Sequence, residues 1–141
     1  MTFLSTDDFK TVCDPQTLTV INQDDTANLD RAERYAIEEV SSYLRTRYDV
    51  GTAFSRTGDQ RNGFLVMIVA DVALYHLVSW LPKRIGFEIR ETRYNQAIAW
   101  LKDVQSGKAT PDLPTPTDPT PGQETSQPVR YGGWGKSEYQ Y

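Results

Sequence analysis

Apolar residues recur at helical spacings in two long stretches of the chain. Between residues 26 and 48 they lie three and four positions apart, while charged and polar side chains occupy the opposite side. The same spacing returns between residues 89 and 105. Both stretches therefore predict amphipathic helices that each bury one face. The apolar faces are Leu29, Ala32, Ala36, Val40, Tyr43 and Leu44 in the first stretch, and Tyr94, Ala97, Ile98, Leu101 and Val104 in the second.

The stretch between these two patterns is apolar on every side. Residues 64–81 contain Asp71 and His76 as their only acidic or basic side chains, and Pro82 follows directly. A membrane-spanning helix needs about 20 apolar residues, and an aspartate near its centre costs about 3 kcal/mol on insertion scales. We therefore expect a central helix that the other helices cover, and no membrane partner.

The remaining stretches before residue 107 carry weaker patterns. Ser5 or Thr6 can cap a short helix that ends near residue 14, and residues 16–21 are compatible with one or two helical turns. Residues 48–61 hold two glycines and a polar run, which favours a loop or a short hairpin. Gly107 provides a C-terminal stop for the last helix. The sequence thus predicts an all-α fold, a small bundle of about four helices.

Composition divides the 141 residues into three parts, because six of the eight prolines follow residue 106. We expect a helical body at residues 1–107, a Pro/Thr-rich linker at 108–128 and an aromatic, glycine-containing anchor at 129–141. The linker is too polar and proline-rich to bury a core, and such composition favours extended geometry. Linker and anchor together form a long extended C-terminal arm of roughly 100 Å at ~3.1 Å per residue.

The anchor differs from the linker because aromatic rings alternate with glycines. Aromatic rings supply much of the binding energy at interfaces, and glycines let a partner's backbone approach closely. We therefore predict that this segment holds the arm on another polypeptide; the alternative is a merely solubilising segment. The predicted interface residues are Tyr131, Gly132, Gly133, Trp134, Tyr139 and Tyr141.

Charge and nucleophile content limit the function classes. The 15 basic and 19 acidic side chains give a net charge of −4, whereas a protein that reads DNA needs a basic face. The single Cys13 and the single His76 suggest no third group that would orient a nucleophile pair. We expect His76 to be a core residue with a partnered ring nitrogen. The sequence predicts no enzyme, and no catalytic, cofactor-binding or metal-binding residues.

Three weaker motifs have structural alternatives. One is an oxygen-rich frame with calcium-loop spacing, but Ala27 stands where such a loop needs glycine, and helix capping explains the same residues. Asp71 could be a general base, yet an ion pair with Arg45, Arg47 or Arg93 is the favoured role. Lys108, Pro111 and Pro114 match a generic PxxP ligand of low specificity. The calcium-like frame comprises Asn22, Asp24, Thr26, Asn28, Asp30 and Glu33.

Three runs of the sequence, residues 39–50, 71–77 and 93–108, resemble the helix signatures of the head completion or head-to-tail connector family of tailed phages, in its Mu-like group. The order and spacing of the runs carry the resemblance, which spans about residues 3–113. Residues 130–135 are similar to the glycine and aromatic segment with which the family ends. The loop at 51–63 and the longer Thr/Pro linker depart from the family pattern.

The resemblance implies a structural virion protein at the neck, assembled in the host cytoplasm. It implies partners as well: the portal protein, neighbouring copies in a ring expected to be a dodecamer, a tail-side stopper or tail terminator protein, and passing genomic DNA without sequence-specific binding. The ring would extend the DNA channel and offer a docking surface for tail components. A soluble helical scaffolding or regulatory adaptor, which recruits a partner through its Pro-rich segment, is the alternative.

Overall fold

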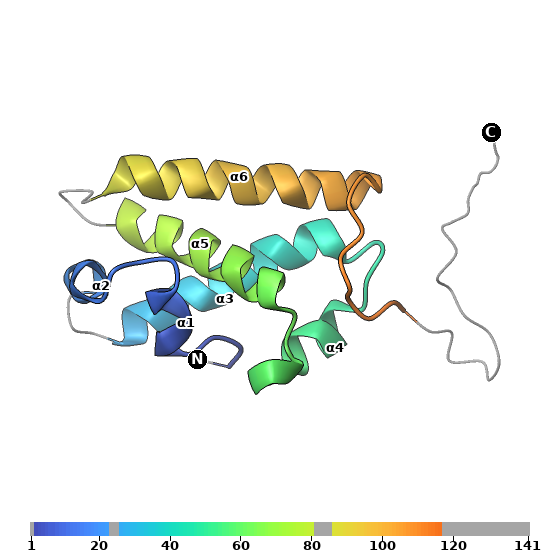
Figure 1. Ribbon diagram of the computed structural model, residues 1–141, viewed down its shortest axis with the longest axis horizontal. Coiled ribbons are helices and arrows are strands. Elements are labelled where there is room, and N and C mark those ends of the chain that lie inside the picture. The colour runs from blue at the N-terminus through green and yellow to red at the C-terminus, as the bar shows by residue number, and fades with distance from the viewer. Residues whose placement is uncertain (1, 23–25, 81–85, 117–141) are drawn as a thin grey trace.

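Three long helices form the framework of the molecule (Figure 1). The computed structural model describes residues 2–22, 26–80 and 86–116. In these ranges the helices are α1 (Thr6–Lys10), α2 (Pro15–Asn22), α3 (Thr26–Leu44), α4 (Val50–Ser55), α5 (Gly63–Ser79) and α6 (Phe87–Ser106), with a 3-10 turn at Gly58–Gln60. The long helices α3, α5 and α6 all contact one another. The described residues contain no strand, which confirms the predicted all-α class.

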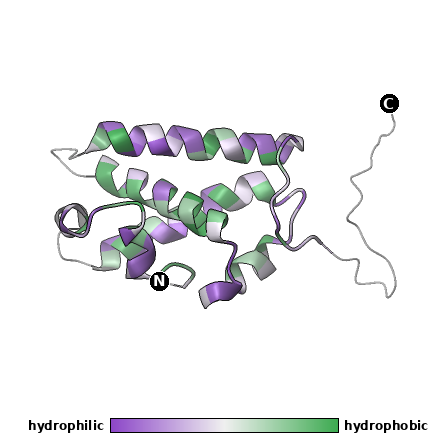
Figure 2. Cartoon of the chain, viewed as in Figure 1, coloured by the Kyte–Doolittle hydropathy of each residue, from purple (hydrophilic) through white to green (hydrophobic). Residues whose placement is uncertain are grey.

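Helix α5 is the central helix, as its uniformly apolar sequence predicts. Most of its side chains are buried, and Figure 2 shows it as hydrophobic along nearly its whole length, whereas α6 alternates with polar residues. Asn62 begins the helix, because its side-chain oxygen accepts a hydrogen bond from Leu65 N at 2.9 Å. Within the described ranges, no helix has both the length and the apolar character that crossing a bilayer requires.

The C-terminus of α6 also follows the prediction. Gly107 has φ 88°, a left-handed conformation that glycine adopts without a steric penalty. The turn lets Lys108 N donate to Asp103 O at 2.8 Å, and so satisfies one of the last free carbonyls of the helix. The chain therefore leaves α6 sharply and turns back toward the rest of the body.

The prediction for residues 48–61 is wrong. Instead of a loop or hairpin, the chain forms α4 and the 3-10 turn, and α3 ends at Leu44 rather than near residue 48. Asp49 caps α4, since its carboxylate accepts hydrogen bonds from Thr52 N at 3.2 Å and from Thr52 Oγ1 at 2.6 Å. Ala53 is buried on the core. A helix of six residues is too short to show a periodic pattern, so its cap and one buried side chain define it.

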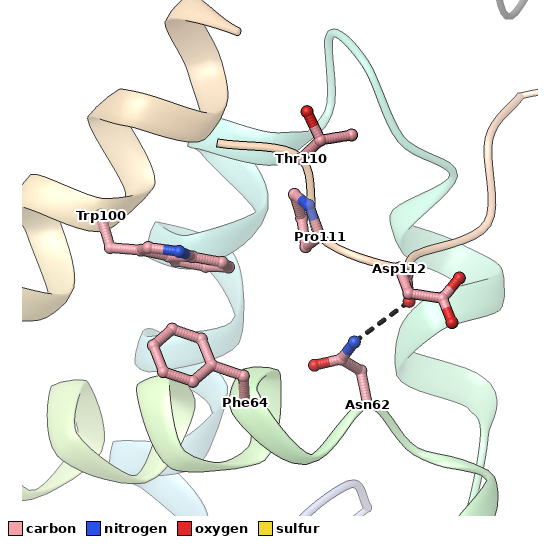
Figure 3. Close-up of a pocket in the computed structure, with 6 residues that line it drawn as sticks. All are labelled: Asn62, Phe64, Trp100, Thr110, Pro111 and Asp112. Carbon is pink, nitrogen blue, oxygen red and sulfur yellow. Dashed lines mark hydrogen bonds between the residues drawn. The ribbon is translucent and has the colours of Figure 1, made fainter. Parts of the chain in front are cut away.

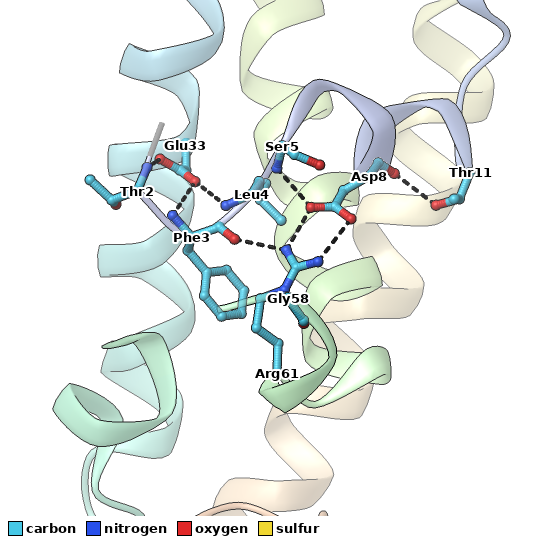
Figure 4. Close-up of polar contacts among 9 residues, drawn as sticks. All are labelled: Thr2, Phe3, Leu4, Ser5, Asp8, Thr11, Glu33, Gly58 and Arg61. Atoms are coloured by element: carbon cyan, nitrogen blue, oxygen red, sulfur yellow. Dashed lines mark hydrogen bonds and ion pairs between the residues drawn. The ribbon is translucent and has the colours of Figure 1, made fainter. Parts of the chain in front are cut away.

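Residues 2–4 form a short strap across α3 (Figure 4). Glu33, on α3, is 1% exposed, and its carboxylate accepts backbone hydrogen bonds from Thr2, Phe3 and Leu4 at 3.0, 3.0 and 2.6 Å. Arg61 donates to Phe3 O at 2.8 Å. We call residues 2–4 the N-terminal strap.

The Arg61 guanidinium joins the strap to α1. It pairs with Asp8, with Nη1 2.6 Å from Oδ2 and Nη2 3.2 Å from Oδ1. Asp8 also accepts a hydrogen bond from Ser5 N at 2.7 Å, which fits the predicted helix start at Ser5 or Thr6. Partial burial would raise the pKa of Asp8, but the hydrogen bonds from Arg61 and Ser5 outweigh it and lower this pKa.

Candidate functional site

All the predicted anchor residues lie outside the described residues. They are Tyr131, Gly132, Gly133, Trp134, Tyr139 and Tyr141. The beginning of the segment that carries them, residues 108–116, is described, and we call it the arm root. The candidate site is therefore the place where the arm root meets the helical body.

Besides the turn at the end of α6, hydrogen bonds to two helix-capping residues and a buried side chain hold the arm root on the body. Pro114 O accepts a hydrogen bond from Asp49 N at 2.8 Å, and Asp112 O accepts one from Asn62 Nδ2 at 3.1 Å. Leu113, between them, is buried at the edge of the core. Asp49 and Asn62 are also the N-caps of α4 and α5, so the residues that begin these helices also position the arm root.

The first turn of the arm root is fixed by Arg47, which lies beyond the end of α3. Arg47 Nε donates to Gln105 O at 3.2 Å. A Cβ atom at Gly107 would lie only 3.1 Å from Arg47 Nη2, so the guanidinium packs directly against the glycine. The arm root thus starts at a defined position relative to both α3 and α6.

A groove runs beside the arm root (Figure 3). Its volume is about 340 Å³, and its lining combines two aromatic rings with polar groups. The rings of Phe64, from α5, and Trp100, from α6, meet edge to face with centroids 4.8 Å apart. Phe64 is 46% exposed, a large fraction for an aromatic side chain in a folded body. The lining residues are Asn62, Phe64, Trp100, Thr110, Pro111 and Asp112.

Sequence reasoning missed this groove, although part of it had a local signal. Asn62 directly precedes the apolar run of α5, which is the position that an N-cap residue occupies. Phe64 and Trp100 gave no signal, because each belongs to a long apolar or amphipathic pattern. Only the packing of α5 against α6 shows that their rings meet at the surface.

Asp71 forms the ion pair that the sequence predicts. Its partner is Arg93, with Nε 2.6 Å from Oδ1 and Nη2 3.0 Å from Oδ2. The hydrogen bonds to Asp71 raise the pKa of Arg93. A second cation, Arg90, was not predicted; its Nη1 lies 3.9 Å from Asp71 Oδ1, and its Nη2 donates to Val12 O at 3.1 Å. This buried cluster joins α5 to α6 and to the chain after α1.

The prediction for His76 is confirmed in part: its ring nitrogen has a partner, but the residue is half-buried rather than a member of the core. His76 Nε2 lies 2.7 Å from Glu39 Oε1, and the Tyr94 hydroxyl donates to Glu39 Oε2. Burial, and then the hydrogen bond to Glu39, raise the pKa of Tyr94. The carboxylate of Glu39 therefore links three long helices, since it lies on α3 and its partners lie on α5 and α6.

Cys13, the other residue of the possible nucleophile pair, is buried. Burial raises the pKa of the Cys13 thiol, which disfavours the reactive thiolate.

Glu33, the last residue of the calcium-like frame, and the PxxP motif are used inside the fold, whereas Asp24 of that frame lies outside the described residues. The Glu33 carboxylate would be the last ligand of a calcium loop. In the structure it instead accepts hydrogen bonds from the amides of the N-terminal strap. Pro111 lines the groove, and the carbonyl of Pro114 is bonded to the body. Among the described residues, no three side chains of the His, Cys, Asp or Glu type gather as a metal site.

Comparison with known proteins gives one result. The sequence profile of the family described as "Bacteriophage Mu, Gp36" matches residues 3–129, which include helices α1 to α6 and the linker. Searches of curated proteins and of solved structures found no match. The match indicates a Mu-like phage protein with a role in phage structure or morphogenesis. The chain belongs to the bacteriophage Mu Gp36 family.

Proposed function

We propose that this protein is a head completion adaptor, a head-to-tail connector at the neck of the phage particle. In this role, copies of the chain form a ring on the portal, extend the DNA channel and present a docking surface to a tail-side stopper or terminator protein. Family membership supports a protein of the phage particle. The connector role adds a position and a set of partners, which the experiments below are designed to test.

The observation that carries the proposal is the fixed origin of the C-terminal arm. Asp49 and Asn62 hold the arm root, so the chain reaches Pro116 at the same place in every copy, with 25 residues still to follow. A ring subunit needs this property, because equivalent contacts must repeat around the symmetry axis. Weak contacts that repeat in this way add up through effective concentration.

The charge of the chain is compatible with a channel that DNA must traverse. Its net charge of −4 is of the same sign as the phosphate backbone. A basic lining would neutralise phosphates and bind DNA in a salt-dependent way. An acidic ring would let DNA pass without such binding.

The direct test combines full-length protein with the purified portal ring. We expect a complex that co-sediments, and electron microscopy that shows density for the added ring in the rotational symmetry of the portal. Phage that lack the gene are expected to accumulate DNA-filled heads without tails. Normal tail attachment in such phage would overturn the proposal.

The role of the arm is tested with phage that encode a chain lacking residues 129–141. We expect these particles to incorporate much less of the protein than wild-type particles do. A chain with Tyr35 changed to alanine is the matched control, because this exposed aromatic residue lies on α3 and outside the arm. Undiminished incorporation of the shortened chain would exclude an anchoring role for the segment.

A further inference from the structure

The groove beside the arm root has the properties of a docking site. It is open, and its rings are aromatic, which is the composition of pockets that bind an inserted side chain. Its volume of about 340 Å³ lies near the lower end of the roughly 300 to 1,000 Å³ of small-ligand sites. One aromatic side chain with its flanking backbone suits such a space better than a folded domain does.

We propose that this groove binds the anchor segment of a neighbouring copy, with Trp134 inserted between Phe64 and Pro111. The inference rests on the proposed ring and names the contact that closes it. Trp134 stands between Gly133 and Gly135, so the backbone on both sides can approach the groove wall closely. The exposed carboxylate of Asp112 on the groove rim complements Arg130 of the incoming segment.

The position of the groove favours a neighbouring copy over the same copy. Pro111 and Asp112 line the groove only a few residues before the described chain ends at Pro116. A return to the same groove would require the proline-rich linker to reverse its direction, and such linkers are semi-rigid and extended. Docking on the next copy needs no reversal.

The length of the linker fits this arrangement. Trp134 lies 18 positions after Pro116, and extended proline-rich chain covers ~3.1 Å per residue, about 55 Å in all. A compact body of this size has a radius of gyration of ~13 Å, which corresponds to a spacing of roughly 35 Å between touching copies. The arm can therefore reach the equivalent groove next door but not one several copies away.

Each copy would then offer one groove and one arm, which is a head-to-tail contact. Contacts of this kind close into a ring when the rotation between copies permits closure. The groove thereby gives the predicted anchor a defined receptor, made by α5, α6 and the arm root.

The test uses the full-length chain with p-benzoylphenylalanine, a photocrosslinking residue, in place of Trp134. Equal amounts of nitrogen-15-labelled and unlabelled protein are mixed, illuminated and digested, alone and after binding to the portal. We expect adducts that join residue 134 to peptides containing Phe64, Trp100 or residues 110–112, with one labelled and one unlabelled partner. Adducts confined to single copies, adducts on other surfaces, or no adducts would each overturn the inference.

Two substitutions in the groove sharpen the result. Phe64→Ala, which removes a largely exposed ring, is expected to lower the mixed adducts about tenfold, as for a central interface residue. Asp112→Lys leaves the backbone carbonyl that Asn62 binds in place but repels Arg130, so it is expected to lower them as well. Ile89→Ala is the control, because Ile89 is 58% exposed and lies outside the groove. Unchanged adducts in both groove variants would contradict the inference.

The outcomes separate this inference from the proposed function. Mixed adducts at the groove in a protein that does not bind the portal would support the copy-to-copy contact and overturn the connector role. Normal portal binding with adducts that Phe64→Ala does not reduce would support the connector role and overturn the groove as the docking site.

Discussion

The two non-helical segments that lie on the bundle are held by different chemistry. The N-terminal strap is bound by a buried carboxylate, Glu33, and by the paired guanidinium of Arg61. The arm root is bound by hydrogen bonds between uncharged groups, including those of Asp49 N and Asn62 Nδ2, and by Leu113. Hydrogen bonds to charged groups contribute about 1.5–3 kcal/mol each, and neutral ones about 1 kcal/mol. Charged groups thus hold the strap, whereas uncharged groups and the buried Leu113 hold the arm root in its position.

The difference determines what the release of each segment would cost. Removing the strap would strand the carboxylate of Glu33 in an apolar interior, so its release is coupled to unfolding. Releasing residues 112–114 would expose Leu113 and free the donors and acceptors of two hydrogen bonds, which water can satisfy. Release of the arm root is therefore less costly than release of the strap.

Among these substitutions, Glu33→Gln is expected to reduce the free energy of unfolding most. The amide keeps the shape of the side chain but loses the charge and one acceptor, so at least one of the three backbone donors, of Thr2, Phe3 and Leu4, loses its partner. We expect the free energy of unfolding to fall by about 3 kcal/mol, measured by urea denaturation. Glu38→Gln on the same helix is the control, because the side chain of Glu38 is 74% exposed. Equal stability of the two variants would show that the strap does not depend on this carboxylate.

Leu113→Ala tests the arm root in the same way. Because Leu113 lies at the edge of the core, we expect a loss of about 2 kcal/mol, at the low end for buried leucines. The amide of Asp49, which donates to Pro114, should exchange its hydrogen faster, as mass spectrometry can detect. Thr115→Ala, at an exposed position of the same segment, should change neither quantity. A loss as large as that of Glu33→Gln would remove the contrast between the two segments.

The ion pair between Arg61 and Asp8 beside the strap also predicts that the free energy of unfolding depends on pH. The pKa of Asp8 in the folded protein lies below its ordinary value of 3.8. Ionised Asp8 therefore stabilises the fold above that pH, and this contribution is lost as the pH falls from 3.8 through the folded-state pKa.

Asp8→Asn should reveal this dependence in unfolding curves between pH 7 and pH 2. We expect the wild-type protein to be more stable than the variant by about 1 kcal/mol at neutral pH, with the difference vanishing at the acid end. Asp7→Asn is the control, because the Asp7 side chain is 87% exposed. A constant difference across the range would show that the Arg61 pair does not set the acid sensitivity of the strap.

Much of the framework could be predicted from the sequence, since α3, α5 and α6 are long enough to display their periodicity. Helix α4 could not, because its identity rests on the Asp49 cap and on a single buried alanine. Glu33 shows a different reason for a missed contact. It lies four residues after Leu29 and three before Ala36, within the apolar face, but a pattern of residue types does not reveal which backbone amides will reach a buried carboxylate.

Asn62→Asp, which is expected to change stability least, separates the two roles of Asn62. Its oxygen caps α5, and its nitrogen tethers the arm root through Asp112 O. Asn62→Asp keeps an acceptor for Leu65 N and removes the donor, so the cap should survive while the tether is lost. We expect a change of less than about 0.5 kcal/mol in global stability, together with faster proteolysis after residue 108.

Asn62→Ala, which removes both contacts, provides the comparison. It should add a capping loss of about 1 kcal/mol to the same increase in proteolysis. If Asn62→Asp left proteolysis of the arm root unchanged, the hydrogen bond to Asp112 would contribute nothing to its attachment. Leu113 and Asp49 would then hold the segment by themselves, and the groove beside it would keep its shape without Asn62.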